Sequence, residues 1–126
     1  MVNNKIRTFT DLNAWKKSHE LVLFTYKITN LFPKKEIFSL TSRMRRAAIS
    51  ITSNIAEGFS RQSYKEKTHF YSIALGSLTE LQSQFLVARD ITYIKEEYRI
   101  FFNKSVLAHK LINGLIKYFK SIIHNT

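Results

Sequence analysis

The sequence contains no cysteine, one proline and three glycines among its 126 residues. Without cysteine the chain can form neither a disulfide nor a thiolate metal site, which fits a reducing compartment. The scarcity of proline and glycine leaves few positions at which a helix would break. No run approaches the roughly 18 to 20 apolar residues that a membrane-spanning helix requires, and residues 1–12 contain no apolar signal segment. We therefore expect a cytoplasmic protein that does not associate with a membrane.

Acidic residues are also scarce, and the chain is strongly basic as a result. It has 20 Lys and Arg against 9 Asp and Glu, a formal net charge of +11, and no acidic residue follows Glu97. Such a charge indicates a polyanionic partner, because each contact between a basic side chain and a phosphate releases condensed counterions. A basic surface that only keeps the protein soluble is the alternative interpretation.

Apolar residues recur at intervals of three and four along most of the chain, which is the pattern of amphipathic helices. Asp11 can cap the first helix, Pro33 follows its end, and the stretch from Ser63 to Glu66 is a capping box. Short connections favour antiparallel neighbours, so we expect an all-α protein, an antiparallel up-down-up-down four-helix bundle. We expect one domain over residues 1–126, with helices at about residues 11–31, 38–60, 64–90 and 95–123.

The second and third helices each carry one stripe of core residues. On the second helix the stripe is Leu40, Met44, Ala47, Ile51 and Ile55. On the third helix the stripe is Phe70, Ala74, Leu78, Leu81, Phe85 and Ala88. One stripe for each helix is what a bundle requires, because residues three and four apart lie on the same helical face.

The first and fourth helices have more apolar surface than one bundle can bury. The first carries two stripes, namely Leu12, Trp15, His19, Val22 and Tyr26, and on the opposite side Leu21, Phe24, Ile28 and Leu31. The fourth has a core stripe of Tyr98, Phe101, Ala108, Ile112, Ile116, Phe119 and Ile123, flanked by Leu107, Leu111 and Tyr118. Since contiguous exposed apolar surface usually marks an interface, we expect a homo-oligomer.

Small and polar residues follow one flank of the second helix, where large apolar side chains would be usual. They are Arg43, Arg46, Ser50, Ser53, Asn54 and Glu57, and the equivalent flank of the third helix has Ser77, Glu80 and Gln84. If the two flanks meet, small side chains permit close approach and Glu80 can accept hydrogen bonds from Arg43 or Arg46. We interpret these residues as a partly buried structural polar seam.

Other basic residues are candidates for phosphate contacts. We expect Arg45 to face away from the core and to join Arg61, Lys65 and Lys67 around the turn between the second and third helices. The fork of an arginine suits phosphate oxygens, although a solvated charged turn would have the same composition. With two lysines of the fourth helix, the predicted nucleic-acid-binding residues are Arg45, Arg61, Lys65, Lys67, Lys110 and Lys117.

The sequence offers little for catalysis. It has no glycine-rich phosphate loop, nucleophile elbow or zinc-ligand spacing. Glu66 and His69 have the Glu-x-x-His spacing of di-metal bundle sites, but the chain has no second such pair. His19 lies on an expected core face, where a hydrogen-bonded or interface histidine is more common than a catalyst. We therefore expect no enzymatic activity, no metal and no cofactor.

Several motifs together resemble one known family. They are Phe9-x-Asp11-Leu12-x-x-Trp15, Ser53-Asn54-Ile55-Ala56-Glu57-Gly58-Phe59 and Gly76-Ser77-x-x-Glu80-Leu81. In these motifs, and over nearly its whole length, the chain resembles the four-helix bundle proteins encoded in intervening sequences of bacterial 23S ribosomal RNA genes. The resemblance implies an all-helical protomer in a ring-like homopentamer, without an established enzymatic activity.

The resemblance also bears on partners. The family is similar to the accessory variability determinant protein of diversity-generating retroelements, a basic pentameric bundle that associates with a reverse transcriptase and with nucleic acid. By this analogy we expect an accessory protein that binds RNA or DNA. The alternative is a protein-interaction scaffold for a polymerase or reverse-transcriptase-like partner, in which contact with nucleic acid is incidental.

Overall fold

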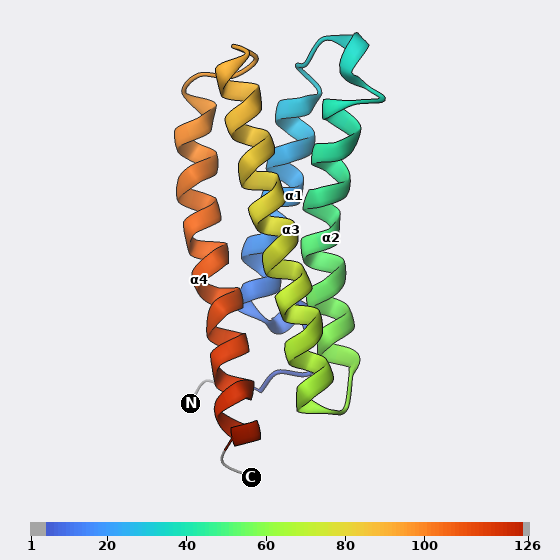
Figure 1. Cartoon of the computed structure of the whole chain (residues 1–126), viewed down its shortest axis with the longest axis vertical. Helices are drawn as coiled ribbons and strands as arrows, with labels where there is room; N and C mark the ends of the chain where they lie inside the picture. The colour runs from blue at the N-terminus through green and yellow to red at the C-terminus, as the bar shows by residue number, and fades with distance from the viewer. Residues whose placement is uncertain (1–4, 125–126) are drawn as a thin grey trace.

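Four long helices run side by side in the computed structural model, which describes residues 5–124 (Figure 1). They are α1 (Asn13–Thr29), α2 (Leu40–Ser60), α3 (Tyr64–Asp90) and α4 (Glu97–His124), with short 3-10 helices η1 (Phe9–Asp11) and η2 (Lys34–Glu36) before α1 and α2. Each long helix packs against two others, in the order α1, α2, α3, α4 and back to α1. The fold is therefore the predicted all-α four-helix bundle. No helix in this part of the chain has the length and apolar character needed to cross a membrane.

The ends of the helices follow local hydrogen bonding. The bounds of α3 equal the expected range, and Ser63 begins it by accepting the amide of Glu66 at 3.1 Å. Helices α1, α2 and α4 each begin two residues later than expected. Asp11 does not cap α1, because it belongs to η1 and its carboxylate accepts the amides of Arg7 and Thr8 at 2.9 and 3.0 Å. Those two hydrogen bonds lower the pKa of Asp11.

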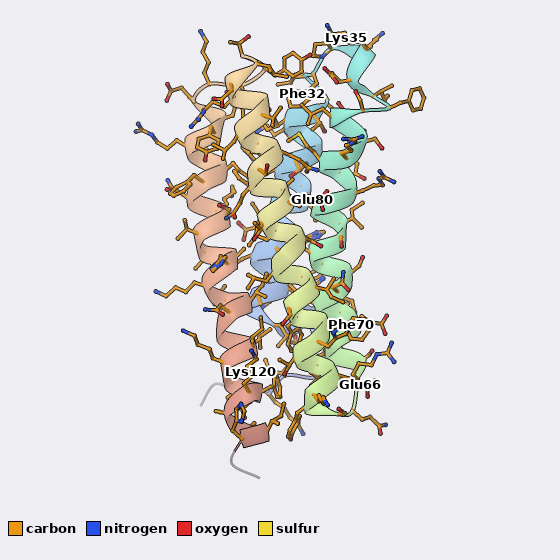
Figure 2. The ribbon with its side chains drawn as sticks, viewed as in Figure 1. Phe32, Lys35, Glu66, Phe70, Glu80 and Lys120 are labelled. Atoms are coloured by element: carbon orange, nitrogen blue, oxygen red, sulfur yellow. The ribbon has the colours of Figure 1, made fainter. Side chains whose placement is uncertain are left out.

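The core stripes of α2 and α3 agree with the sequence pattern except at two residues. Met44, Ala47, Ile51 and Ile55 of α2 and Ala74, Leu78, Leu81, Phe85 and Ala88 of α3 are all buried, whereas Leu40 is only partly buried. At the lower end of α3, Tyr71 takes the inward position and is 1% exposed, while its neighbour Phe70 is only partly buried (Figure 2). Burial raises the pKa of Tyr71 to about 12.

Helix α1 differs most from the expected pattern. Its inward line combines the expected apolar residues Leu21, Val22 and Ile28 with the small or polar residues Ala14, Ser18, Thr25 and Thr29. Tyr26 and Leu31, which we expected on apolar stripes, are 37% and 76% exposed. The hydroxyls of Thr25 and Thr29 tolerate burial because they donate to the carbonyls of Leu21 and Thr25, each at 2.7 Å. The line that faces the core thus contains small and polar side chains among the expected apolar ones.

Helix α4 places most of its expected stripe inward. Phe101, Ala108, Ile112 and Ile116 are buried, and Ser105 joins them by donating to the carbonyl of Phe102 at 2.8 Å. Tyr98 and Phe119 pack partly against the core. Leu107 and Tyr118 of the flanking stripe are exposed.

The two loops at the end of the bundle far from the chain termini are fixed to each other (Figure 1). The Tyr93 hydroxyl donates to Glu36 Oε2 and the Ser39 hydroxyl donates to Glu36 Oε1, both at 2.6 Å. The Phe32 and Tyr93 rings pack with centroids 5.1 Å apart. The hydrogen bonds from Ser39 and Tyr93 lower the pKa of the Glu36 carboxyl, and the hydrogen bond to Glu36 raises the pKa of Tyr93.

Gly58 determines how closely α2 and α3 approach at the opposite end. A Cβ at this position would lie 2.7 Å from Tyr71 Cε1 and 3.2 Å from Phe70 Cβ. Tyr71 is buried and its ring has little room to move. We predict that Gly58→Ala lowers the free energy of unfolding by about 1 to 3 kcal/mol, because this overpacking outweighs the gain in helix propensity. Urea denaturation measures the change.

Gly76 of α3 provides the matched control, because a Cβ there meets no atom within 4 Å. Gly76→Ala should raise stability by about 0.5 to 1 kcal/mol, the usual gain for a helix interior. Equal responses of the two variants would contradict the close approach at Gly58.

Candidate nucleic-acid interface

The structure separates Arg45 from the other predicted phosphate-contacting residues. Arg45 lies near the start of α2, whereas Arg61 follows its last residue. At 1.5 Å per residue the intervening 16 residues span roughly 24 Å. The expectation that Arg45 joins Arg61, Lys65 and Lys67 is therefore wrong, because a continuous helix holds Arg45 near the other end of the bundle.

Arg45 connects α2 to the end of α1. Its Nε donates to Thr29 Oγ1 and its Nη2 donates to Asn30 Oδ1, each at 2.9 Å. The guanidinium also lies 4.7 Å from the centroid of the Tyr26 ring. These contacts use the Nε and Nη2 edge of the guanidinium, so Arg45 has the structural role of joining two helices.

Lys67 also has a structural role. Its ammonium group donates to the carbonyl of Phe59 at 2.7 Å and to that of Gly58 at 3.3 Å, and it thereby caps the end of α2. Burial lowers the pKa of Lys67. The contacts leave Lys67 directed at protein carbonyls instead of at solvent.

Arg61 and Lys65 remain on the surface around the α2–α3 turn. Arg61 Nη2 lies 2.9 Å from Glu57 Oε2, and the guanidinium lies 4.8 Å from the centroid of the Phe70 ring. The Arg61 side chain is nevertheless 40% exposed, and Lys65 is exposed. A pocket of about 450 Å³ lies here, lined by Arg61, Lys65, Glu66, His69 and Phe70.

The end of α4 adds basic residues that the sequence analysis missed. Together with the start of α3 it borders a second, open surface pocket of about 330 Å³, whose lining includes Lys65, His69, Ser72, Lys120, Ile123 and His124. Lys120 and Glu66 both lie at this lower end of the bundle (Figure 2). The expected antiparallel order of the helices is the signal that could have indicated these residues. In that order the first turns of α3 lie beside the last turns of α4, so Lys65 and Lys120 are placed at the same end of the bundle.

We define the terminal basic surface by four cations of the α2–α3 turn and the end of α4 that are exposed or partly exposed: Arg61, Lys65, Lys117 and Lys120. Lys117 precedes Lys120 by three residues on α4 and so lies on the same side of the helix. Lys110 is also exposed on α4, but it lies roughly 15 Å from Lys120 along the helix. Four of the six predicted residues, Arg61, Lys65, Lys110 and Lys117, are therefore accessible to a ligand.

The polar seam between α2 and α3 has a small hydrogen-bonded centre. The hydroxyls of Ser50 and Ser77 lie 2.8 Å apart, and Asn54 Nδ2 donates to the Ser50 carbonyl at 2.8 Å and to its hydroxyl at 3.1 Å. These three residues are partly buried, whereas Ser53 and Glu57 are exposed. The seam is thus narrower than the sequence pattern indicates.

Glu80, midway along α3, does not have the expected partners (Figure 2). It accepts a hydrogen bond from Gln84 Nε2 at 3.1 Å. Within residues 5–124 it forms no hydrogen bond or ion pair with Arg43 or Arg46, although all three line a pocket of about 270 Å³ with Ser50. The serines bring the backbones together and leave the long charged side chains at the exposed rim, where water solvates them.

Metal-ligating residues do not gather around Glu66 and His69. Among the described residues, no three histidine, aspartate or glutamate side chains are placed to hold one ion. His19 stacks on Trp15 with ring centroids 4.7 Å apart. Its surroundings in the described chain are therefore aromatic.

Comparisons with known proteins agree with the fold. The model of a family described as 23S rRNA-intervening sequence protein matches residues 10–114. A crystal structure of a protein of unknown function from the S23 ribosomal protein family of Bacteroides thetaiotaomicron is similar, with a TM-score of 0.75 and 25% sequence identity. The similarity covers 82% of this chain and 95% of that chain. No curated protein sequence matches the chain.

The contacts of Arg45 predict a stability effect that is separate from any ligand. Lysine cannot reproduce the two hydrogen bonds of the guanidinium fork. Arg45→Lys should therefore lower the free energy of unfolding by about 1 kcal/mol, as measured by urea denaturation. Arg46→Lys is the matched control, since Arg46 is exposed, and it should change stability by less than about 0.5 kcal/mol. Equal stability of the two variants would refute the structural role of Arg45.

Proposed function

The chain belongs to the family of 23S rRNA-intervening sequence proteins, and from this membership and its charge we propose that it is a non-enzymatic, homo-oligomeric accessory protein that binds nucleic acid. The proposed contact region is the terminal basic surface, extended along α4 toward Lys110. The ligand is the phosphate backbone, and the contacts are independent of sequence.

The observation that carries this proposal is the excess of cations without a carboxylate partner. Among the described residues the ion pairs to carboxylates involve the basic residues Lys17, Arg61, Arg89 and Lys104. Lys65, Lys117 and Lys120 of the terminal basic surface have no such pair in this part of the chain. With a net charge of +11, the protein gains free energy when it exchanges condensed counterions for contacts between its basic side chains and phosphates.

The proposed oligomer rests on exposed apolar side chains of α1 and α4. Leu23 is 58% exposed on α1, and Ile100, Phe102, Val106 and Leu107 are between 41% and 49% exposed on α4. A second copy of this chain is the proposed cover for these side chains, because they continue along faces that the bundle itself does not use. A homopentamer is the state that the family resemblance implies.

Binding to a structured RNA should weaken steeply with salt, and a filter-binding titration from 50 to 200 mM salt measures this dependence. Each phosphate contact contributes about 0.9 to the slope of log K against log salt. We predict that Lys65→Gln combined with Lys117→Gln reduces this slope by about 1 to 2. No retention of RNA near 50 mM salt would overturn the proposed function.

The control for this titration is Lys34→Gln combined with Lys35→Gln, which removes the same charge at the opposite end of the bundle. Lys35 lies at the upper end and Lys120 at the lower end (Figure 2). The control should leave the slope nearly unchanged. Equal losses in the two double variants would show that total charge matters and that the terminal basic surface does not.

The oligomer is tested by size exclusion with light scattering. We expect a mass that is a multiple of the 14.8 kDa protomer. Leu107→Glu should lower that mass, because it places a charge in the proposed contact, whereas Ile37→Glu in the exposed α1–α2 connection should not. A single-copy particle in dilute buffer would refute the oligomer.

A further inference from the structure

We propose, as an extension of the proposed nucleic-acid binding, that the pocket between α3 and α4 binds the terminal phosphate of a nucleic-acid strand. We call it the strand-end pocket. Its polar lining comes from the first turns of α3 and the last turns of α4, and consists of Lys65, Thr68, His69, Ser72, Lys120 and His124. The site therefore forms only when the two helices pack antiparallel.

The charge of the strand-end pocket is what distinguishes it. Two ammonium groups and two imidazoles line it, and no carboxylate does. Three other surface pockets each include a carboxylate, from Glu20, Glu66 or Glu80. An anion placed in the strand-end pocket thus meets cations without a competing negative side chain in its lining.

The helix dipoles do not decide whether the strand-end pocket favours an anion or a cation. The pocket adjoins the N-terminus of α3, whose partial positive charge favours an anion, and the C-terminus of α4, whose partial negative charge opposes one. These two partial charges are of similar size and largely offset each other. The side chains therefore set the sign of the pocket, and they set it positive.

A terminal phosphate fits these groups better than an internal one. A phosphate monoester carries a charge of about −1.5 to −2 near neutral pH and offers three strong acceptor oxygens, whereas an internal diester carries about −1. Lys65, Lys120 and the Ser72 hydroxyl can donate to these oxygens, while the Thr68 hydroxyl already donates to the Tyr64 carbonyl at 2.8 Å. A terminal phosphate is bonded to one sugar only and can therefore enter a pocket, whereas an internal phosphate carries a sugar on each side.

The dimensions support an occupant larger than a free anion. The volume of about 330 Å³ is at the lower limit of pockets that hold small ligands. It leaves room for the last sugar beside the phosphate, with Ile123 as an apolar contact. The neighbouring pocket shares Lys65 and His69 with this one, so the strand can continue from the strand-end pocket across the terminal basic surface.

The test is fluorescence anisotropy of the full chain with short single-stranded RNAs that differ only at their ends: 5′-phosphate, 3′-phosphate or hydroxyl at both. We expect one of the phosphorylated strands to bind at least about fivefold more tightly than the hydroxyl-ended strand, a gain of the size of one charge-assisted hydrogen bond. Inorganic phosphate at matched ionic strength should compete with that strand only weakly.

Two variants connect the effect to the pocket. Lys120→Gln should abolish the preference for the phosphorylated end, and it should weaken binding of the hydroxyl-ended strand only by about as much as the loss of one phosphate contact elsewhere on the protein. Lys110→Gln, the same change on α4 outside the pocket, should weaken all strands alike and keep the preference. Circular dichroism of both variants checks that the bundle remains folded.

The outcomes separate this inference from the proposed function. If all strands bind equally, the strand-end pocket is refuted while nucleic-acid binding stands. If inorganic phosphate displaces the strand as effectively as a phosphorylated strand does, the pocket takes a small anion and the inference is overturned. If no strand binds at low salt, the proposed function itself fails.

Discussion

The close approach of α2 and α3 is the constraint on which the rest of the bundle depends. It is made at two points, the Ser50–Ser77 hydroxyl pair and the contact of Gly58 with Tyr71. These points lie about 12 Å apart along α2, at 1.5 Å for each residue. Small residues at both keep the helices close over this distance and explain why a helix with so few large side chains on one flank still packs well. Once α2 and α3 are fixed, α1 and α4 complete the bundle against their remaining faces.

The same constraint determines which cations are left for a ligand. Arg45 is used in holding α2 to the end of α1, and Lys67 is used in capping α2 beside Gly58. Both basic residues donate hydrogen bonds to protein acceptors. The positive charge that is left for a ligand lies on exposed residues without a carboxylate pair in the described chain, and Lys65 of α3 and Lys117 and Lys120 of α4 are three of them. Structural and ligand-binding cations are thus distinguished by their partners, which composition does not show.

Periodicity predicts those parts of this fold that depend on large apolar side chains. The number of helices, their order and the core stripes of α2 and α3 follow from it, because these stripes are uninterrupted. On α1 the same reasoning succeeds only in part: the expected Leu21, Val22 and Ile28 are buried, but the inward line also runs through Ser18 and Thr25, which periodicity of apolar residues does not indicate. The capping role of Ser63 at the start of α3 can be predicted from the sequence, because its hydrogen bond joins residues only three positions apart. The roles of Arg45 and Lys67 cannot be predicted in this way, because the acceptors of their hydrogen bonds lie on or at the end of another helix.

The terminal basic surface illustrates why a site in an antiparallel bundle is hard to read from sequence. Lys65 and Lys120 are 55 positions apart, and no motif joins them; they meet because α3 and α4 run in opposite directions. In such a fold, any residue in the first turns of one helix neighbours the last turns of the next. Exposed charges at helix ends that make no ion pair within the described chain, such as Lys65 and Lys120, are therefore free to vary without changing the core. A bundle can thus alter what its ends bind without altering how it folds.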